Sequence, residues 1–467
     1  MTKEISDKLT YDDLKLGEKA KEAFLRGESP EEIKSKYPVY LNTKEVYAGL
    51  NVTDLSIAGV LGKIPSLYVG RPGCGKSQLA QDFFNYYFGG NKSQGGQGVF
   101  MVGDKDLNIY DDVYRDLNIK EGRWIPNENV KGLYHFIDEI NRCPTMIQNQ
   151  FLRLLDGFLQ HRGAKTPLGE KEYSIGVATA NLGNGEIPGT FDIDWATWDR
   201  MGLVLDFDYN QFKPTDEDKM LRSKLRTPDS KTKDSPIRDI SNKLIEAERE
   251  ISHNSRNLGL EANAVIDYIT FGLENCYNPE IGNKDKNWPH RCQDCSKNKD
   301  AEALCSLVRN PEGRILETLP KFVASLDYLI KLKNPNSNHD AIDLGFKAFE
   351  LTGAYQKLLN PMILRQKYNE QNPKMMGEVV ESLKVDFRKN EDFILTSLEK
   401  AQNGDKFDDY FKRKADGKIG FGHSKLSKNA KEDVQKLNPF VNDREIGLSW
   451  VKEQAEIYKT LNKLKGD

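Results

Sequence analysis

Two patterns of hydrophobic and polar residues alternate between residues 51 and 210. Short, mostly apolar runs are separated by longer stretches in which apolar residues recur at helical spacing. The runs cover residues 65–69, 98–102, 133–137, 173–178 and 202–207. Buried strands that alternate with helices typically form a parallel sheet covered on both faces. The pattern therefore predicts an α/β domain.

The sequence on either side of this domain has mainly helical periodicity. Ser29 followed by Pro30 is a typical helix start, and residues 211–240 read as a polar connector. Apolar residues again recur at helical spacing in 242–251, 262–273 and 314–333. We expect four parts: an N-terminal helical extension (1–50), the α/β domain (51–210), a helical lid (211–400) with a cysteine-containing insert (276–305), and a linker with a C-terminal helix (401–467).

Composition narrows the class of protein. A chain of 467 residues predicts two or three domains, and a net charge of −3 supplies no overall attraction to nucleic acid or anionic membrane. The most apolar stretch, 55–70, is interrupted by Lys63 and Pro65, so no membrane span is expected. The first residues lack the order of a signal peptide, and six cysteines are too few for a disulfide scaffold. We expect a cytoplasmic protein.

A phosphate-binding loop follows the first apolar run. The loop residues, which fit the pattern G-x-x-x-x-G-K-[ST], are Gly70, Arg71, Pro72, Gly73, Cys74, Gly75, Lys76 and Ser77. A helical stretch begins at Gln78, so the loop has the strand–loop–helix context that phosphate binding requires. We expect Lys76 to reach the β- and γ-phosphates of ATP and the Ser77 hydroxyl to bind Mg²⁺.

Two adjacent carboxylates end the third apolar run. Asp138 and Glu139 follow a strand-like sequence, 62 positions after Lys76. We expect Asp138 to hold the magnesium and Glu139 to polarise the attacking water. The loop and the acidic pair together predict an ATPase.

The acidic pair also begins a family signature. The residues Asp138, Glu139, Ile140, Asn141 and Arg142 resemble the D-E-I-N-R motif of the MoxR branch of the AAA+ ATPases. Farther along, Asn181 matches the family's sensor-1 residue. Arg200, in Trp-Asp-Arg, resembles the arginine that acts in trans, although Met201 replaces the usual aromatic residue after it. Arg314 is the sensor-2 candidate, in a segment similar to the Ser-Pro-Arg motif of the lid.

The resemblance implies a homo-oligomeric ring, typically a hexamer, in which Arg200 serves the nucleotide of the neighbouring subunit. It also implies a chaperone-like task, the remodelling or maturation of a partner protein, often one with a von Willebrand factor A domain. The segment 160–172 lies where such folds project a hairpin toward the ring axis. It either contacts the client or is an ordinary polar hairpin.

The cysteine-containing insert predicts a structural metal site. Two cysteines are spaced as C-x-x-C, which lets both thiolates reach one ion, and two more lie nearby. The expected ligands are Cys276, Cys292, Cys295 and Cys305, with His290 as a substitute for one of them. Zinc is the first expectation, an iron–sulfur cluster is the second, and four unrelated thiols are the alternative.

Two other functions fit part of the pattern. A nucleic-acid motor related to McrB would use the insert and the basic residues of the tail to contact DNA or RNA, although acidic residues among them do not favour it. A nucleotide-gated scaffold would bind ATP and assemble with little turnover. The presence of Lys76, Asp138, Glu139 and Asn181 argues against the scaffold.

Overall fold

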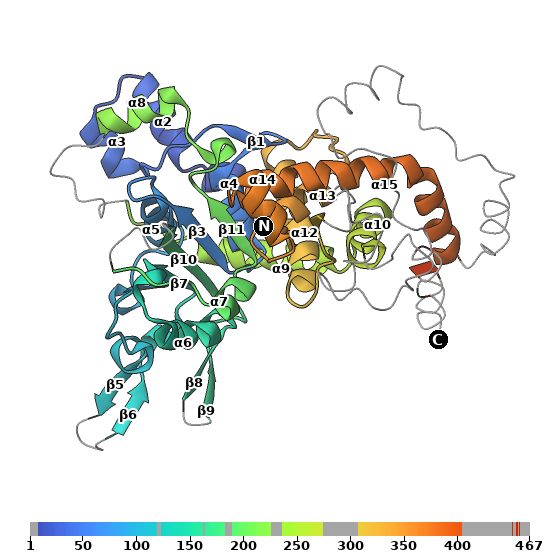
Figure 1. Ribbon diagram of the computed structural model, residues 1–467. Helices are drawn as coiled ribbons and strands as arrows, with labels where there is room; N and C mark the ends of the chain where they lie inside the picture. The colour runs from blue at the N-terminus through green and yellow to red at the C-terminus, as the bar shows by residue number, and fades with distance from the viewer. Residues whose placement is uncertain are drawn as a thin grey trace, which may run out of the picture. The chain divides into compact units, whose positions relative to one another are not determined.

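The computed structural model describes most of the chain (Figure 1). The described residues are 8–118, 123–161, 164–182, 189–225, 236–273 and 307–403, with Val451, Gln454, Ala455 and Ile457. The chain divides into two compact units. The first comprises Met1–Arg256 and Ala324–Asn338, and the second comprises Asn257–Val323 and His339–Asp467.

A five-stranded parallel sheet forms the centre of the first unit. Its strands lie in the order β11 (Leu203–Asp206), β3 (Ser66–Gly70), β10 (Ile175–Asn181), β7 (Tyr134–Asp138) and β4 (Gly98–Val102). All five strands predicted from the apolar runs are present, which confirms the α/β prediction. The register places Asn181 beside Gly70, so the ends of β10 and β3 meet at the same edge.

Helices cover this sheet because its strands are apolar on both faces. Every residue of β3 and β10 is buried. Helix α5 (Lys76–Tyr86) packs on β3, β7 and β10, and α6 (Thr145–Leu155) packs on β10 and on α7 (Trp195–Arg200). All ten residues of α4 (Val52–Leu61) are buried, and this helix packs on β11 and on α9 (Ser241–Ser255).

The N-terminal extension packs onto the α/β domain together with a helix that the sequence pattern did not predict. It contains α1 (Tyr11–Leu14), α2 (Gly17–Leu25), α3 (Pro30–Lys36) and the short strands β1 (Glu45–Tyr47) and β2 (Leu50–Asn51). Ser29 caps α3, as expected. Residues 211–240 were expected to be a polar connector, but they contain the helix α8 (Asp216–Leu225). The prediction of a connector was therefore wrong for this helix. Its Leu221 and Leu225 pack with Ala20, Ala23, Ile33 and Leu41.

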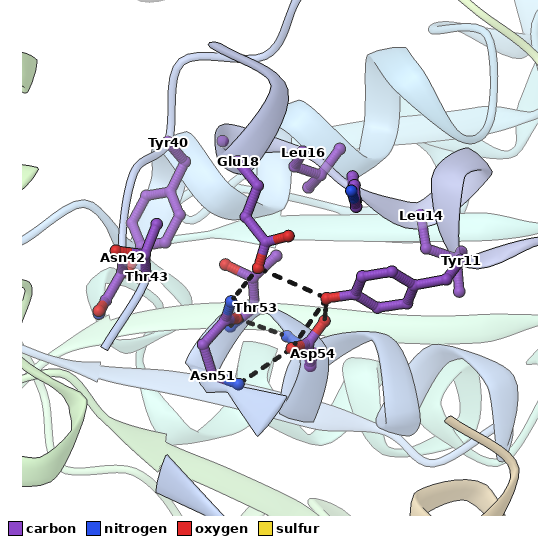
Figure 2. A pocket seen from close by; sticks show the side chains of 12 residues that line it. Tyr11, Leu14, Leu16, Glu18, Tyr40, Asn42, Thr43, Asn51, Thr53 and Asp54 are labelled. Atoms are coloured by element: carbon purple, nitrogen blue, oxygen red, sulfur yellow. Dashed lines mark hydrogen bonds between the residues drawn. The ribbon is translucent and has the colours of Figure 1, made fainter. Parts of the chain in front are cut away.

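A small pocket lined by polar groups lies between the extension and the start of α4 (Figure 2). The Tyr11 hydroxyl donates to Asp54 Oδ1 at 3.0 Å, and Lys333 lies 3.1 Å from Asp54 Oδ2. The Asn51 amide donates to Glu18 at 3.2 Å. Burial raises the pKa of Asp54, although the Lys333 ammonium opposes it. These buried contacts attach the extension to the α/β domain.

Two antiparallel hairpins extend from the first unit, both in the lower part of Figure 1. One consists of β8 (Phe158–His161) and β9 (Ala164–Pro167), within the region where a hairpin was expected. The other consists of β5 (Arg115–Asn118) and β6 (Arg123–Pro126) and was not expected. The remaining short helical turns are Lys92–Gln94, Ile109–Val113, Glu128–Lys131, Ile140–Arg142 and Asn210–Phe212.

In its described part, the second unit consists mainly of helices. Its elements are α10 (Leu260–Asp267) with the turn Tyr268–Gly272, the first part of α12 (Ile315–Lys333), α13 (Ala341–Gly353), α14 (Pro361–Tyr368) and α15 (Asn372–Gln402). Tyr268 packs edge-on against Phe346 and Phe387 and donates its hydroxyl to Asp386 at 2.6 Å. No helix in the described parts of the chain is both long and apolar enough to cross a membrane.

Asp13 of α1 provides a test of how the extension is held. Partial burial opposes ionisation, but hydrogen bonds from Lys243, Thr10 and Arg238 lower the pKa of Asp13 to about 2. Because the pKa is lower in the folded than in the unfolded chain, this stabilisation is complete above about pH 4 and is lost as the pH falls toward 2.

We expect Asp13→Asn to lower the free energy of unfolding by about 2 kcal/mol at pH 7 and by about half of that at pH 3, measured by urea unfolding. Asp12→Asn is the matched control, because Asp12 is exposed and, within the described residues, forms an ion pair with Lys19 alone. The control should cost less than about 1 kcal/mol. Equal effects of the two substitutions would contradict the prediction.

Candidate phosphate-binding and hydrolytic site

The phosphate-binding loop connects the end of β3 to the start of α5, as the sequence predicted. Gly73 and Gly75 have φ angles of 82° and 106°, in the left-handed region that favours glycine. A Cβ atom at Gly75 would stand 2.8 Å from Tyr40, so the loop also needs glycine there for space. The loop therefore places backbone N–H groups at the beginning of α5, where an anion binds well.

Lys76 turns back into the loop. Its ammonium donates to the carbonyl oxygens of Gly70 and Arg71 at 2.8 and 2.9 Å. It also donates to Asn181 Oδ1 at 3.0 Å. The residue is only 5% exposed, and a buried ammonium needs such partners. Lys76 thus connects the loop with the end of β10.

Two hydroxyl groups meet at Asp138. Ser77 Oγ and Thr179 Oγ1 each donate to Asp138 Oδ1 at 2.6 Å. Thr179 also accepts the backbone N–H of Glu139 at 2.9 Å. The hydroxyl of Ser77 and the carboxylate of Asp138 are oxygen ligands of the kind that Mg²⁺ prefers. These two groups fit this ion. Thr179, which the motifs did not identify, orients the Asp138 carboxylate.

The Glu139 carboxylate has two neighbours that donate hydrogen bonds. Asn181 Nδ2 donates to Oε1 at 3.0 Å, and Arg142 Nε lies 2.6 Å from Oε2. The backbone of Glu139 is left-handed, with φ 55°, which is uncommon outside glycine. Asn141 supports Asn181 by donating to its carbonyl oxygen at 2.8 Å. Asn181 therefore bridges the loop lysine and Glu139, which lie 63 positions apart in the sequence.

The other loop residues have supporting contacts. The backbone N–H of Arg71 donates to Asp208 at 2.8 Å, and the Gln78 amide donates to Asp82 at 2.6 Å. Cys74 is partly exposed. Cys143, just beyond the acidic pair, is buried, and burial raises the pKa of its thiol to about 11. A thiol with that pKa stays protonated at neutral pH, which fits a packing role.

The two arginines with expected catalytic roles are both among the described residues. Arg200 is at the end of α7, where its Nε lies 3.3 Å from Asp156 Oδ2 and its Nη1 donates to the Ala196 carbonyl at 2.9 Å. Arg314 is exposed, lies in the second unit and immediately precedes α12. Hydrogen bonds thus connect Lys76 with Asn181, Asn181 with Glu139, and Ser77 with Asp138, whereas Arg200 contacts Asp156 and Ala196.

The expected metal site falls on residues that the structure does not describe. Cys276, His290, Cys292, Cys295 and Cys305 all lie outside the described residues. Within the described part of the chain, no three His, Cys, Asp or Glu side chains form a group that could hold a metal ion.

A family model describes the region that carries this site. Residues 65–201 match the AAA domain of the dynein-related subfamily. The chain carries an AAA domain. The match runs from the residue before β3 to the residue after α7 and includes the phosphate-binding loop, the acidic pair, Asn181 and Arg200.

Two further comparisons concern the whole chain. No curated protein matches the chain. Among solved structures, a putative ATPase from Cytophaga hutchinsonii is similar with 15% sequence identity and a TM-score of 0.45, over 69% of this chain and 87% of that chain.

Thr179 of the AAA domain should be needed for magnesium-dependent turnover. Thr179→Val removes both hydrogen bonds that orient Asp138 and the Glu139 backbone. We expect about 10- to 100-fold lower ATP turnover, with more Mg²⁺ required for half-maximal rate, because such supporting residues typically have effects of this size. Thr179→Ser keeps the hydroxyl and should stay within about threefold of the wild type. A Val variant as active as the Ser variant would contradict this role.

Proposed function

We propose that this chain is a Mg²⁺-dependent ATPase of the MoxR type. The observation that carries the proposal is the continuous set of contacts from Lys76 through Asn181 to Glu139, beside the Ser77–Asp138 pair. A cation that neutralises phosphates, oxygen ligands for a metal and a carboxylate for water activation are what phosphoryl transfer to water requires. The match of residues 65–201 to an AAA domain supports this assignment.

The residues of the site have separate roles in this proposal. Lys76 and the loop amides bind the phosphates of ATP, while Ser77 and Asp138 hold Mg²⁺. The ion, when bound, neutralises charge on the β- and γ-phosphates. Glu139 accepts a hydrogen bond from the attacking water, and Asn181 positions the Glu139 carboxylate. Thr179 keeps Asp138 and the Glu139 backbone in place.

We further propose that hydrolysis takes place at the interfaces of a homo-oligomeric ring, with Arg200 acting on the nucleotide of the neighbouring subunit. A guanidinium placed beside the γ-phosphate stabilises the charge of the transition state. Arg200 is held by Asp156 and Ala196 within its own chain. Assembly would have to exchange the Asp156 contact for the neighbour's phosphate. Arg314 is the sensor-2 candidate of the same proposal.

The proposed output is the remodelling or maturation of a protein client, for which a protein with a von Willebrand factor A domain is the first candidate. The MoxR resemblance supports this class of client. The β8–β9 hairpin is the proposed contact, because it leads through a short turn into β10, the strand that carries Thr179 and Asn181. A pull on the hairpin could thus be coupled to the nucleotide site.

Binding and hydrolysis should separate in two variants. Lys76→Ala should abolish both binding of a fluorescent mant-ADP probe and ATP turnover, because the phosphates lose their buried cation. Glu139→Gln should still bind mant-ADP within about threefold of the wild type but turn over at least about 100-fold more slowly. Turnover by Glu139→Gln at the wild-type rate would contradict the hydrolytic proposal and favour a nucleotide-gated scaffold.

The ring proposal makes a prediction about concentration. Specific ATPase activity should rise with protein concentration and fall at least about tenfold in Arg200→Ala, since the arginine would be supplied by a neighbour. Arg249→Ala is the control, because Arg249 is an exposed residue of α9 that pairs with Glu246. Activity that is independent of concentration and survives the Arg200 substitution would exclude trans action.

A further inference from the structure

Arg222 of α8 lies beside the phosphate-binding loop and has no anionic partner among the residues that the structure describes. Its guanidinium carbon stands 5.5 Å from the centre of the Tyr40 ring. Among the described residues it takes part in no hydrogen bond or ion pair. A guanidinium carries five N–H donors and is rarely left without acceptors when it is partly buried. The charge of Arg222 is therefore available to a bound anion.

The guanidinium reaches the loop at Gly75. A Cβ atom on Gly75 would stand 2.8 Å from Arg222 Nη2 and 2.8 Å from Tyr40 Cε2. Since a carbon–carbon bond is about 1.5 Å long, Nη2 lies within about 4.5 Å of the Gly75 Cα atom. Gly75 immediately precedes Lys76, so the positive charge is within reach of phosphates bound by the loop.

Neighbouring contacts hold Arg222 in this position. Leu221 and Leu225, on either side of it in α8, are buried in the cluster with α2 and α3. Tyr40 is 1% exposed, and its backbone N–H donates to Asp82 of α5 at 2.9 Å. The Tyr40 ring also packs edge-on against Phe207. The helix that carries Arg222 and the ring beneath it are thus both fixed to the α/β domain.

We propose that Arg222 is a nucleotide-binding residue, which contacts the phosphate chain of the nucleotide held by the loop while its stack on Tyr40 keeps it oriented. Charge-assisted hydrogen bonds from a guanidinium suit phosphate oxygens. This inference rests on the proposed function, because it needs a nucleotide on the loop. It gives the N-terminal extension and α8 a shared role as one wall of the nucleotide site.

Affinity for mant-ADP, measured by fluorescence titration of the full chain, tests this role. Arg222→Ala and Arg222→Gln should each weaken binding by at least about tenfold, and Arg222→Lys should fall between them and the wild type. The matched control is Lys224→Ala. It removes a positive charge from the same helix, but Lys224 lies over the Phe24 ring, and binding should change by less than about twofold.

The variants also distinguish a role of Arg222 in nucleotide binding from a purely structural role, and both of these from failure of the proposed function. Arg222→Gln keeps an aliphatic stem with a polar end next to Tyr40, and its melting temperature without nucleotide should match that of Lys224→Ala. If Arg222→Gln binds mant-ADP as tightly as the wild type while Lys76→Ala does not bind it, Arg222 only packs on Tyr40 and the inference is overturned. If the wild type itself binds no better than Lys76→Ala, the proposed function fails instead.

Discussion

The buried ammonium of Lys76 is the contact on which the arrangement of the site depends. Lys76 is only 5% exposed, so its charge must be surrounded by acceptors, and here these are two loop carbonyls and the amide oxygen of Asn181. Asn181 can supply one because β10 pairs with β3 in a register that sets it beside Gly70. The strand order of the sheet thus determines which polar side chain meets the loop.

The same sheet edge brings the carboxylates to the loop. Strand β7 lies on the other side of β10, so Asp138 comes within reach of both Ser77 and Thr179. Glu139 follows in a left-handed conformation. Its backbone N–H donates to Thr179 and its carboxylate accepts from Asn181, both of which are residues of β10. Such a conformation persists only where surrounding contacts determine it, and these hydrogen bonds are such contacts. The geometry around Glu139 is consistent with a preorganised carboxylate.

The N-terminal extension is packed against the same domain through buried polar and apolar contacts. Its polar groups are buried against α4 and α9, where the Tyr11–Asp54–Lys333 cluster and the Asp13 ion pairs satisfy them. Its apolar residues share a cluster with α8, next to the phosphate-binding loop. Composition alone describes residues 1–50 as short polar helices. In the structure, Tyr40 of this segment lies next to Gly75 of the phosphate-binding loop.

Sequence patterns alone determined the five buried strands, the loop between β3 and α5, the acidic pair and the cap at Ser29, because each depends on residues close together in the chain. Thr179 and Arg222 were not found this way, and neither were α8 and the β5–β6 hairpin. The roles of Thr179 and Arg222 depend on neighbours that are distant in the sequence and are brought together by folding, namely Asp138 for Thr179 and Tyr40 for Arg222. Which strands adjoin, and which side chains then satisfy a buried charge, was decided by the tertiary structure, since local spacing carries no information about strand order.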